Sequence, residues 1–232
     1  MPSFQEFFIK YFKFFFLLHN LYIKNKIYKK KKFYSHSGED LFILNKFKKK
    51  GFYVDVGCHH PTKLNNCHLL YLNGWRGVNI DINEITIDLF NFVRKEDINV
   101  NKAISLKEGI VKYFYSKPLS LYNSLIDREN FEYSKDIESS SLNKILSETK
   151  YKNKQIDFLS IDVEGKDFEV LQSLNFEKYK PIYICVEIWG DTKERNFKLE
   201  NSKIYKLLTE KDYKLVFNKM ENYIFFKNYS IN

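Results

Sequence analysis

The chain alternates strand-length apolar runs with stretches of helical spacing, and this alternation limits its fold more than any other feature. The strand-like runs cover residues 52–57, 77–81, 97–104, 156–162 and 181–187. Between them, residues 84–94 and 168–174 repeat apolar side chains at helical spacing. Parallel strands need such crossover helices, so the pattern predicts an α/β fold with a doubly wound, mostly parallel sheet. Two last runs, 213–217 and 222–226, predict an antiparallel edge, whereas residues 116–141 show no regular pattern.

The predicted strands carry acidic side chains at or near their carboxyl ends, namely Asp55, Asp81, Asp162 and Glu187. Acidic residues are poor strand formers and cost free energy to bury, so their position calls for a solvent-facing or functional reason. In open α/β sheets, ligands bind beyond the carboxyl ends of the strands. We therefore expect the functional site to lie where these acids meet.

Gly57 and Asp81 have the spacing of a nucleoside-binding pair. Gly57 closes the first predicted strand and allows a ligand to approach the backbone closely. Asp81 ends the next strand, where an acid accepts hydrogen bonds from ribose hydroxyls. A dinucleotide site needs a G-x-G-x-x-G turn, but His59 stands at the position of the second glycine and Pro61 where the turn must pack tightly on the helix. The pair favours a cofactor without a pyrophosphate, such as S-adenosylmethionine; an ordinary strand–turn–helix and a NAD-dependent oxidoreductase are the alternatives.

Five segments between residues 35 and 190 follow one family pattern in order. They are residues 35–40, 51–61, 74–81, 97–99 with 103–105, and 156–165. Together they make the chain resemble the FkbM family of S-adenosylmethionine-dependent methyltransferases, in a branch whose first strand runs into a His-Pro turn, here His60-Pro61. Two positions depart from the family, since Cys58 stands where alanine is common and His36 replaces a glutamine.

The resemblance implies a class I methyltransferase fold, whose seven-stranded sheet ends with an antiparallel strand, and S-adenosylmethionine as the cofactor. It implies that Asp55 and Gly57 line the methionine end of the cofactor. Asp81 would hold the ribose hydroxyls, and residues 101–103 would lie beside the adenine. The cofactor-binding residues expected on this basis are Asp55, Gly57, Cys58, His59, Asp81, Ile82, Asn101 and Ala103.

Methyl transfer to an alcohol requires a closely held acceptor, and a base helps because a neutral hydroxyl is a weak nucleophile. Asp162 and Glu164 stand at the end of the 156–162 run and, in an extended chain, point the same way. They could act as base, bind sugar hydroxyls or ligate a divalent ion; an acidic helix cap is the structural alternative. His60 is the third catalytic candidate and His59 a further base, with a histidine bonded within the turn as the alternative.

The three cysteines are odd in number and irregular in spacing, which argues against a disulfide framework and for a reducing compartment. Zinc ligands usually stand two to five residues apart within each pair, whereas the candidates here are adjacent. We therefore predict no metal site from the set Cys58, His59, His60, Cys67 and His68.

Residues 1–33 form a basic aromatic leader ahead of a methyltransferase domain at residues 34–232. Residues 1–50 hold 12 of the 38 basic residues and three of the 29 acidic residues, so residues 51–232 carry no net charge. The basic excess is confined to an N-terminal arm instead of a face of the domain, which argues against a nucleic acid partner.

The leader itself favours an interfacial helix. Its longest uninterrupted apolar run, residues 14–18, is too short to span a membrane, and its charges follow the apolar stretch, unlike those of a secretory signal. Aromatic residues followed by the lysines of residues 24–32 suit contact with anionic lipid. A helix packed on the domain or on a partner, and a signal-anchor, are the alternatives. We expect a cytoplasmic protein at the inner face of a membrane, which residues 4–33 contact.

The predicted function is S-adenosylmethionine-dependent O-methylation of a sugar hydroxyl in a surface glycan or glycolipid precursor. The reaction is implied by the family resemblance. The glycan acceptor is inferred in part from a leader that would place the domain near lipid-linked sugars. The alternatives are a NAD-dependent oxidoreductase and a membrane-attached binding protein without catalytic activity.

Overall fold

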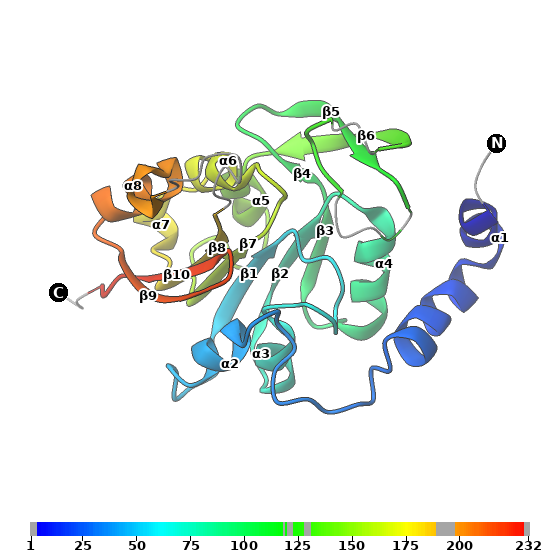
Figure 1. Ribbon diagram of the computed structural model, residues 1–232, viewed down its shortest axis with the longest axis horizontal. Helices are drawn as coiled ribbons and strands as arrows, with labels where there is room; N and C mark the ends of the chain where they lie inside the picture. Colours follow the sequence, from blue (N-terminus) through cyan, green and yellow to red (C-terminus); the bar gives the residue numbers. More distant parts are fainter. Residues whose placement is uncertain (1–3, 118, 120–122, 128–130, 189–197, 230–232) are drawn as a thin grey trace.

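The computed structural model describes residues 4–117, 119, 123–127, 131–188 and 198–229 (Figure 1). Its centre is a seven-stranded sheet with the strand order β3-β2-β1-β7-β8-β10-β9. The strands are β1 (Phe52–Val56), β2 (Arg76–Asp81), β3 (Ile98–Asn101), β7 (Phe158–Ile161), β8 (Tyr183–Glu187), β9 (Lys214–Lys219) and β10 (Asn222–Phe226). The first five in this order are parallel, and β10 runs antiparallel between β8 and β9. The predicted doubly wound, mostly parallel sheet with an antiparallel pair at its edge is confirmed.

A second, three-stranded sheet stands beyond the end of β3 (Figure 1). It consists of β4 (Ala103–Ile104), β5 (Gly109–Tyr115) and β6 (Tyr133–Ser140) in the order β4-β6-β5. The prediction of one strand over residues 97–104 is wrong, because β3 pairs with β2 whereas β4 pairs with β6. The sequence does not indicate β6, since most of its side chains are polar and half of them are exposed.

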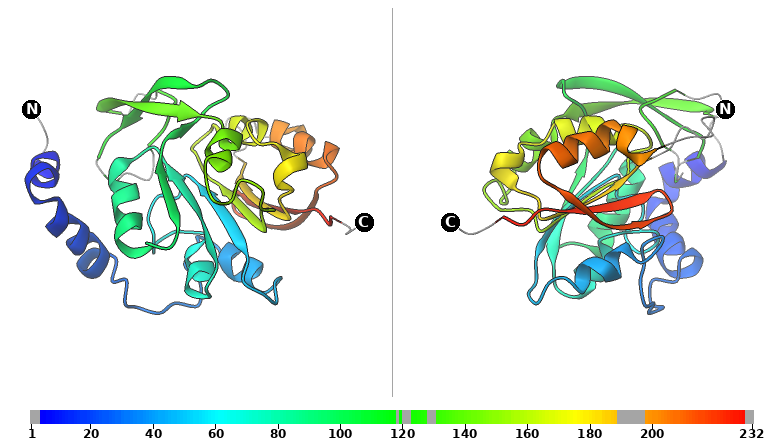
Figure 2. Two further views of the ribbon diagram at one scale, coloured as in Figure 1. Left: turned by 180° about the vertical axis from the view of Figure 1, so that it is seen from behind. Right: turned by 60° about the vertical axis from the view of Figure 1, so that its left-hand side comes forward.

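Helices cover both faces of the main sheet (Figure 2). One face carries α5 (Leu142–Ser147), α6 (Asp167–Gln172), α7 (Phe176–Tyr179) and α8 (Lys203–Glu210), and the other carries α2 (Glu39–Leu44), α3 (His68–Leu72) and α4 (Glu84–Val93). Successive side chains of a strand point to opposite faces. Val54 of β1 therefore packs in the core that includes Leu146 and Leu171, and Tyr53 packs in the core of Ile43 and Leu70. Burial on both faces explains why β1 has little polar alternation.

The leader lies along the outside of α4 (Figures 1 and 2). It consists of α1 (Phe4–Leu18), which continues into a π-helical segment, η1 (His19–Lys24). Leu17 and Leu21 pack against Leu89 of α4. One side of the leader therefore packs on the domain. In the described part of the chain, none of the helices combines the length and the apolar content needed to cross a bilayer.

A buried arginine ties the loop after β1 to the sheet. Arg94 has no exposed surface, and its Nη2 donates hydrogen bonds to the carbonyl oxygen of Pro61 and to Asn65 Oδ1, the latter at 2.7 Å. Asn65 Nδ2 in turn donates to Asp55 Oδ2 at 3.0 Å. Because Pro61 and Asn65 both belong to the loop between β1 and α3, one side chain fixes this loop at two points.

A second group of polar side chains balances the charge of Arg94. Burial would lower the pKa of the guanidinium, but the nearby Tyr53 and Asp97 raise it above its ordinary value, so the side chain stays protonated. The Tyr53 hydroxyl lies 3.5 Å from Arg94 Nη1 and donates to Asp97 Oδ2. Asp97 Oδ1 accepts the Gly77 N–H at 2.8 Å, which holds this acid against the start of β2.

We predict that Arg94→Met lowers the free energy of unfolding by about 3–5 kcal/mol, because removing one member of a buried charge network leaves the others without partners. Arg76→Met is the matched control. Arg76 is partly exposed and pairs with Glu96 at the surface, so its loss should cost less than about 1 kcal/mol. Urea denaturation followed by circular dichroism measures both values. Equal effects of the two substitutions would contradict the role given to Arg94.

Candidate functional site

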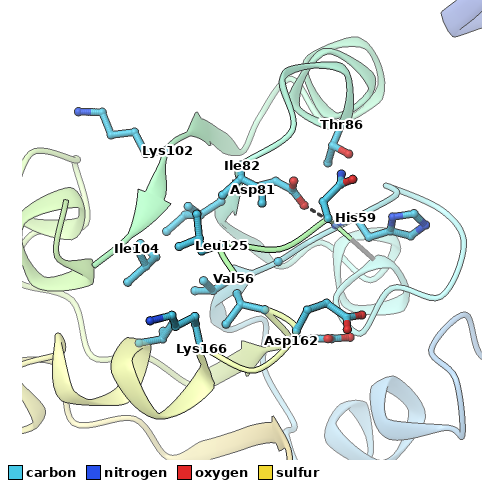
Figure 3. Close-up of a pocket in the computed structure, with 16 residues that line it drawn as sticks. Val56, His59, Asp81, Ile82, Thr86, Lys102, Ile104, Leu125, Asp162 and Lys166 are labelled. Carbon is cyan, nitrogen blue, oxygen red and sulfur yellow. Dashed lines mark hydrogen bonds between the residues drawn. The ribbon is translucent and has the colours of Figure 1, made fainter. Parts of the chain in front are cut away.

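A pocket opens beyond the carboxyl ends of β1, β2 and β7 (Figure 3). Six of the predicted site residues line it, namely Gly57, His59, Asp81, Ile82, Asp162 and Glu164. The other five predicted residues, Asp55, Cys58, His60, Asn101 and Ala103, are not among the residues that line it. Figure 3 shows Asp162 and Lys166 across the pocket from Asp81 and Ile82. The site therefore forms where the strand order predicts it, at the ends of the parallel strands.

The floor of the pocket depends on the absence of a side chain at residue 57. Gly57 has φ +77°, and a Cβ atom added to it would lie 1.8 Å from the carbonyl oxygen of Asp162. The Gly57 N–H donates to the carbonyl oxygen of Ile80 at 2.9 Å, and the Asp162 N–H donates to that of Val56 at 3.0 Å. The turn after β1 is thus held between the ends of β2 and β7, and only glycine fits there.

Asp81 presents a buried carboxylate at the pocket wall. Its Oδ2 accepts the His59 N–H at 2.9 Å, which is the dashed line in Figure 3, and its Oδ1 accepts the Asn83 N–H at 2.8 Å. Burial raises the pKa of Asp81 to about 6, although the two backbone N–H groups oppose the rise. Each carboxylate oxygen keeps acceptor capacity for one further donor, such as a ligand hydroxyl.

The two adjacent histidines have different surroundings. His59 lines the pocket with φ +49°, and burial, with the charges of Lys63 and Lys24, lowers its pKa to about 4. His60 lies behind the wall, where its Nε2 is 3.1 Å from Asn25 Nδ2 and its Nδ1 accepts a backbone N–H of the same loop at 3.2 Å. Burial lowers the pKa of His60 to about 3. Both imidazoles are therefore neutral at neutral pH, and His60 connects the leader to the loop after β1.

Asp55 and Cys58 lie below the turn instead of on its ligand side. Asp55 is buried, its Oδ2 accepts from Asn65, and burial raises its pKa. The Cys58 side chain packs against Ile87 and Phe90 of α4. Both residues thus support the turn that carries Gly57 and are in position to shape the pocket through the backbone.

Asn101 and Ala103 lie behind the wall that carries Asp81 and Ile82. Asn101 Nδ2 donates to the backbone carbonyl oxygen of Asp81 at 3.0 Å, which holds the end of β3 against the end of β2. Ala103 is fully buried in a cluster with Tyr113 and Ile137 of the second sheet. Between them, Lys102 lines the pocket. The segment predicted to lie beside the adenine therefore borders the site.

Two carboxyl groups meet at the other side of the pocket. Asp162 follows β7 and Glu187 ends β8, and the parallel pairing of Ile161 with Val186 brings the two acids to adjacent positions. A hydrogen bond joins their side chains. The Asp162 side chain is open to the pocket but has protein on most sides, so partial desolvation raises its pKa well above the ordinary value. The negative charge of Glu187 adds to the rise. Such a pair is suited to hold one proton between two carboxylates.

The sequence does not predict the roles of Asp167 and Asn123 at the pocket. Asp167 is buried at the start of α6, and its carboxylate accepts the Val163 N–H at 3.2 Å and the Gly165 N–H at 3.1 Å, which fixes the backbone around Glu164. The only signal for this role is an acid at a helix N-terminus. Asn123 lines the pocket, and its buried Oδ1 has no hydrogen-bond partner among the residues that the structure describes. It belongs to the stretch without a regular pattern.

The cysteine and histidine cluster of the sequence does not converge in space. Cys67 is fully buried, and the ring of His68 packs edge-on against Tyr34 with centroids 4.5 Å apart. Among the residues that the structure describes, no group of three or more His, Cys, Asp or Glu side chains is arranged to hold a metal ion.

Comparison with protein families gives one match that covers most of the chain. The model of the methyltransferase FkbM domain matches residues 55–215. That range includes the pocket residues from Gly57 to Val170. No curated protein matches the chain.

Three solved structures show distant similarity. A TehB-like SAM-dependent methyltransferase from Corynebacterium glutamicum is 12% identical, with a TM-score of 0.44, covering 93% of this chain and 97% of that chain. The 16S rRNA methylase ArmA is 11% identical, with a TM-score of 0.42, covering 97% and 98%. The delta-N METTL16 MTase domain is 9% identical, with a TM-score of 0.40, covering 80% and 77%. Likenesses this distant carry no information about the acceptor.

We predict that Gly57→Ala lowers the free energy of unfolding by about 2–4 kcal/mol, because the added methyl group meets a backbone carbonyl that cannot move freely. Gly38→Ala is the matched control. Gly38 has φ +98°, but nothing lies within 4 Å of an added Cβ, so only the backbone strain of about 1 kcal/mol remains. Thermal and urea unfolding give both values. Similar losses would show that the approach of Asp162 does not constrain residue 57.

Proposed function

Because this chain belongs to the FkbM methyltransferase family, with S-adenosylmethionine as cofactor, we propose that it methylates a sugar hydroxyl in a surface glycan or glycolipid precursor. The observation that carries the proposal is the Asp162 carboxyl group, which lies across the pocket from Asp81 and is hydrogen-bonded to Glu187. One wall thus offers an acceptor for ribose hydroxyls, and the other offers a base for the hydroxyl to be methylated. The family match removes the oxidoreductase alternative.

The residues of the pocket fit this cofactor. Gly57 leaves the space that a Cβ would fill, and Asp81 can accept the ribose hydroxyls on its remaining lone pairs. The unpartnered Oδ1 of Asn123 can accept a hydrogen bond from the adenine amino group. Ile82 and Leu125 supply apolar surface beside it. We assign these five residues to cofactor binding.

Asp162 is the group that we assign as base. When bound, S-adenosylmethionine supplies an activated methyl group for transfer to the acceptor oxygen. The pair acts as base from its fully ionised state: Asp162 takes the proton of the acceptor hydroxyl on a carboxylate oxygen, the hydrogen bond to Glu187 then holds this proton between the two groups, and its release to water restores the ionised pair. The raised pKa of Asp162 makes it a stronger base than an ordinary aspartate, while it stays ionised at pH values above that pKa. Glu164 lines the same side and can orient the acceptor.

His60 has a different assignment. Since it contacts Asn25 and lies behind the pocket wall, we propose that it positions the turn that bears His59 and takes no part in proton transfer. Cys58 and Asp55 support the same turn from below.

The charge of the acceptor side supports a neutral, hydroxyl-rich acceptor. Three acids, Asp162, Glu164 and Glu187, stand at this end of the sheet, and carboxylate oxygens accept hydrogen bonds from neighbouring hydroxyls. Lys166 lines the same side, but its Nζ pairs with Glu169 Oε2 at 3.1 Å. The phosphates of a polyanion would be repelled by the acids, and residues 51–232 have no net positive charge to offset the repulsion. The exclusion of nucleic acid therefore stays a prediction, supported by charge.

We predict that the affinity for S-adenosylmethionine rises about tenfold between pH 5 and neutral pH. Asp81 has a pKa of about 6, so it is protonated in acid and accepts ribose hydroxyls poorly, and it becomes a full acceptor once ionised. His59, with a pKa of about 4, does not titrate in this range. Isothermal titration calorimetry across the range measures the effect.

Asp81→Asn should weaken binding and flatten this profile, while Asp136→Asn, at an exposed position on β6, should leave the profile unchanged. A flat profile for the unsubstituted protein, or an unaltered one for Asp81→Asn, would contradict the assignment of Asp81.

Methyl-labelled S-adenosylmethionine and a lipid-linked saccharide fraction test the acceptor. Label recovered as an O-methyl sugar after acid hydrolysis is the expected result, and label in RNA or protein would overturn the proposal. Asp162→Asn should lower turnover about 10²–10⁴-fold without changing cofactor affinity, because a positioned base contributes that much. Asp157→Asn, just before the opposite end of β7, should keep full turnover. Full turnover of Asp162→Asn would remove it as the base.

A further inference from the structure

The leader has two apolar sides, and the domain covers one of them. Leu17 and Leu21 face α4, and Lys13 Nζ is held by Asp88 at 2.5 Å. A surface helix usually buries one apolar stripe and shows polar side chains on the rest of its circumference. Here the side away from α4 is apolar as well, so packing on the domain does not account for it.

The exposed leader patch is defined as Tyr11, Phe12, Phe15, Tyr22 and Ile23. Phe14 is not part of it, because its ring packs edge-on against Phe92 of α4. The helix is irregular here, with non-helical dihedral angles at Phe12 and π-helical geometry from His19 to Lys24, so the patch is defined by exposure and not by spacing. Phe15 is 62% exposed and Ile23 is 65% exposed. Eight of the sixteen large apolar side chains that are exposed in the described part of the chain lie between residues 11 and 33. Apolar exposure gathered on one element marks an interaction surface.

Lysine side chains follow the exposed leader patch directly in the sequence. The exposed lysines that follow it are Lys24, Lys26, Lys29, Lys30, Lys31 and Lys32. The sequence has no acidic residue between positions 9 and 33, although acids equal bases over residues 51–232. The net positive charge of the protein is therefore concentrated in the segment that contains the exposed leader patch.

We propose that the exposed leader patch and the lysines of residues 24–32 dock the protein on an anionic membrane surface. Aromatic rings insert at the boundary between headgroups and acyl chains, and lysines are attracted to anionic headgroups. This combination of apolar insertion with positive charge fits a lipid surface better than it fits a second copy of the chain, which would bring its own positive leader. Docking does not depend on the acceptor that the pocket uses.

Vesicle sedimentation with the full chain tests the proposal. The protein should bind vesicles that contain phosphatidylglycerol, bind pure phosphatidylcholine vesicles much more weakly, and lose most binding at high salt, which screens charge. Lys29→Gln, Lys30→Gln and Lys32→Gln together should lower the partition coefficient roughly 100-fold, about fivefold for each lysine. The same change at three exposed lysines of the domain, Lys112, Lys152 and Lys206, should have little effect.

The apolar part is tested with Phe15→Gln and Ile23→Gln, which should also weaken binding to anionic vesicles. Leu106→Gln and Ile110→Gln form the matched control, because these residues are 53% and 65% exposed on the domain and outside the leader. Absence of vesicle binding, or equal loss in the leader and control variants, would overturn the proposal. A dimer in light scattering that the Phe15 and Ile23 substitutions dissociate, without vesicle binding, would assign the patch to contact between copies.

Discussion

The pocket depends on one buried positive charge. The Arg94 guanidinium donates hydrogen bonds to the Pro61 carbonyl oxygen and to the Asn65 side chain, and so holds the loop after β1. Asn65 in turn donates a hydrogen bond to Asp55. A buried cation is costly unless its environment supplies hydrogen bonds and negative charge. Here Tyr53 and Asp97 supply both. A ligand-binding turn is thereby fixed from the core side, which leaves its outer side free to line the pocket.

The acids of the main sheet have two different roles. Asp55 and Asp97 face inward and stabilise the network under the turn, while Asp81 and Asp162 face the pocket. The strand register gives all four the same parity, so alternation alone does not separate them. They differ in their position along the strands, because Asp81 ends β2 and Asp162 follows β7, whereas Asp55 precedes the last residue of β1 and Asp97 precedes β3. Burial raises the pKa of Asp81 to about 6, and burial together with the charge of Glu187 raises the pKa of Asp162 well above its ordinary value.

The sequence predicts much of the sheet and part of the site. Apolar runs such as 52–57 and 156–162 are visible because their strands are buried on both faces, and Gly57 and Asp81 stand out by spacing. The sequence does not predict the second sheet, since β6 is largely polar and half of its side chains are exposed. Whether Asp81 and Asp162 bind and react as assigned stays a prediction.

Residues whose role depends on long-range contacts are the ones that sequence reasoning misses. Arg94 resembles any basic residue that closes a helix, and nothing local shows that it is fully buried. His60 resembles a base because it adjoins the glycine turn, but its partner Asn25 lies 35 residues earlier. Asn123 belongs to a stretch of sequence without a regular pattern, and only the fold brings it to the pocket.

The contact between Asn25 and His60 ties the leader to the loop that follows β1. Burial holds the pKa of His60 at about 3, so this imidazole is uncharged at neutral pH and the attachment does not depend on charge that salt would screen. The preceding residue, His59, donates its N–H to Asp81 Oδ2. The leader and the pocket carboxylate therefore contact adjacent residues of one loop and are joined through a single peptide unit.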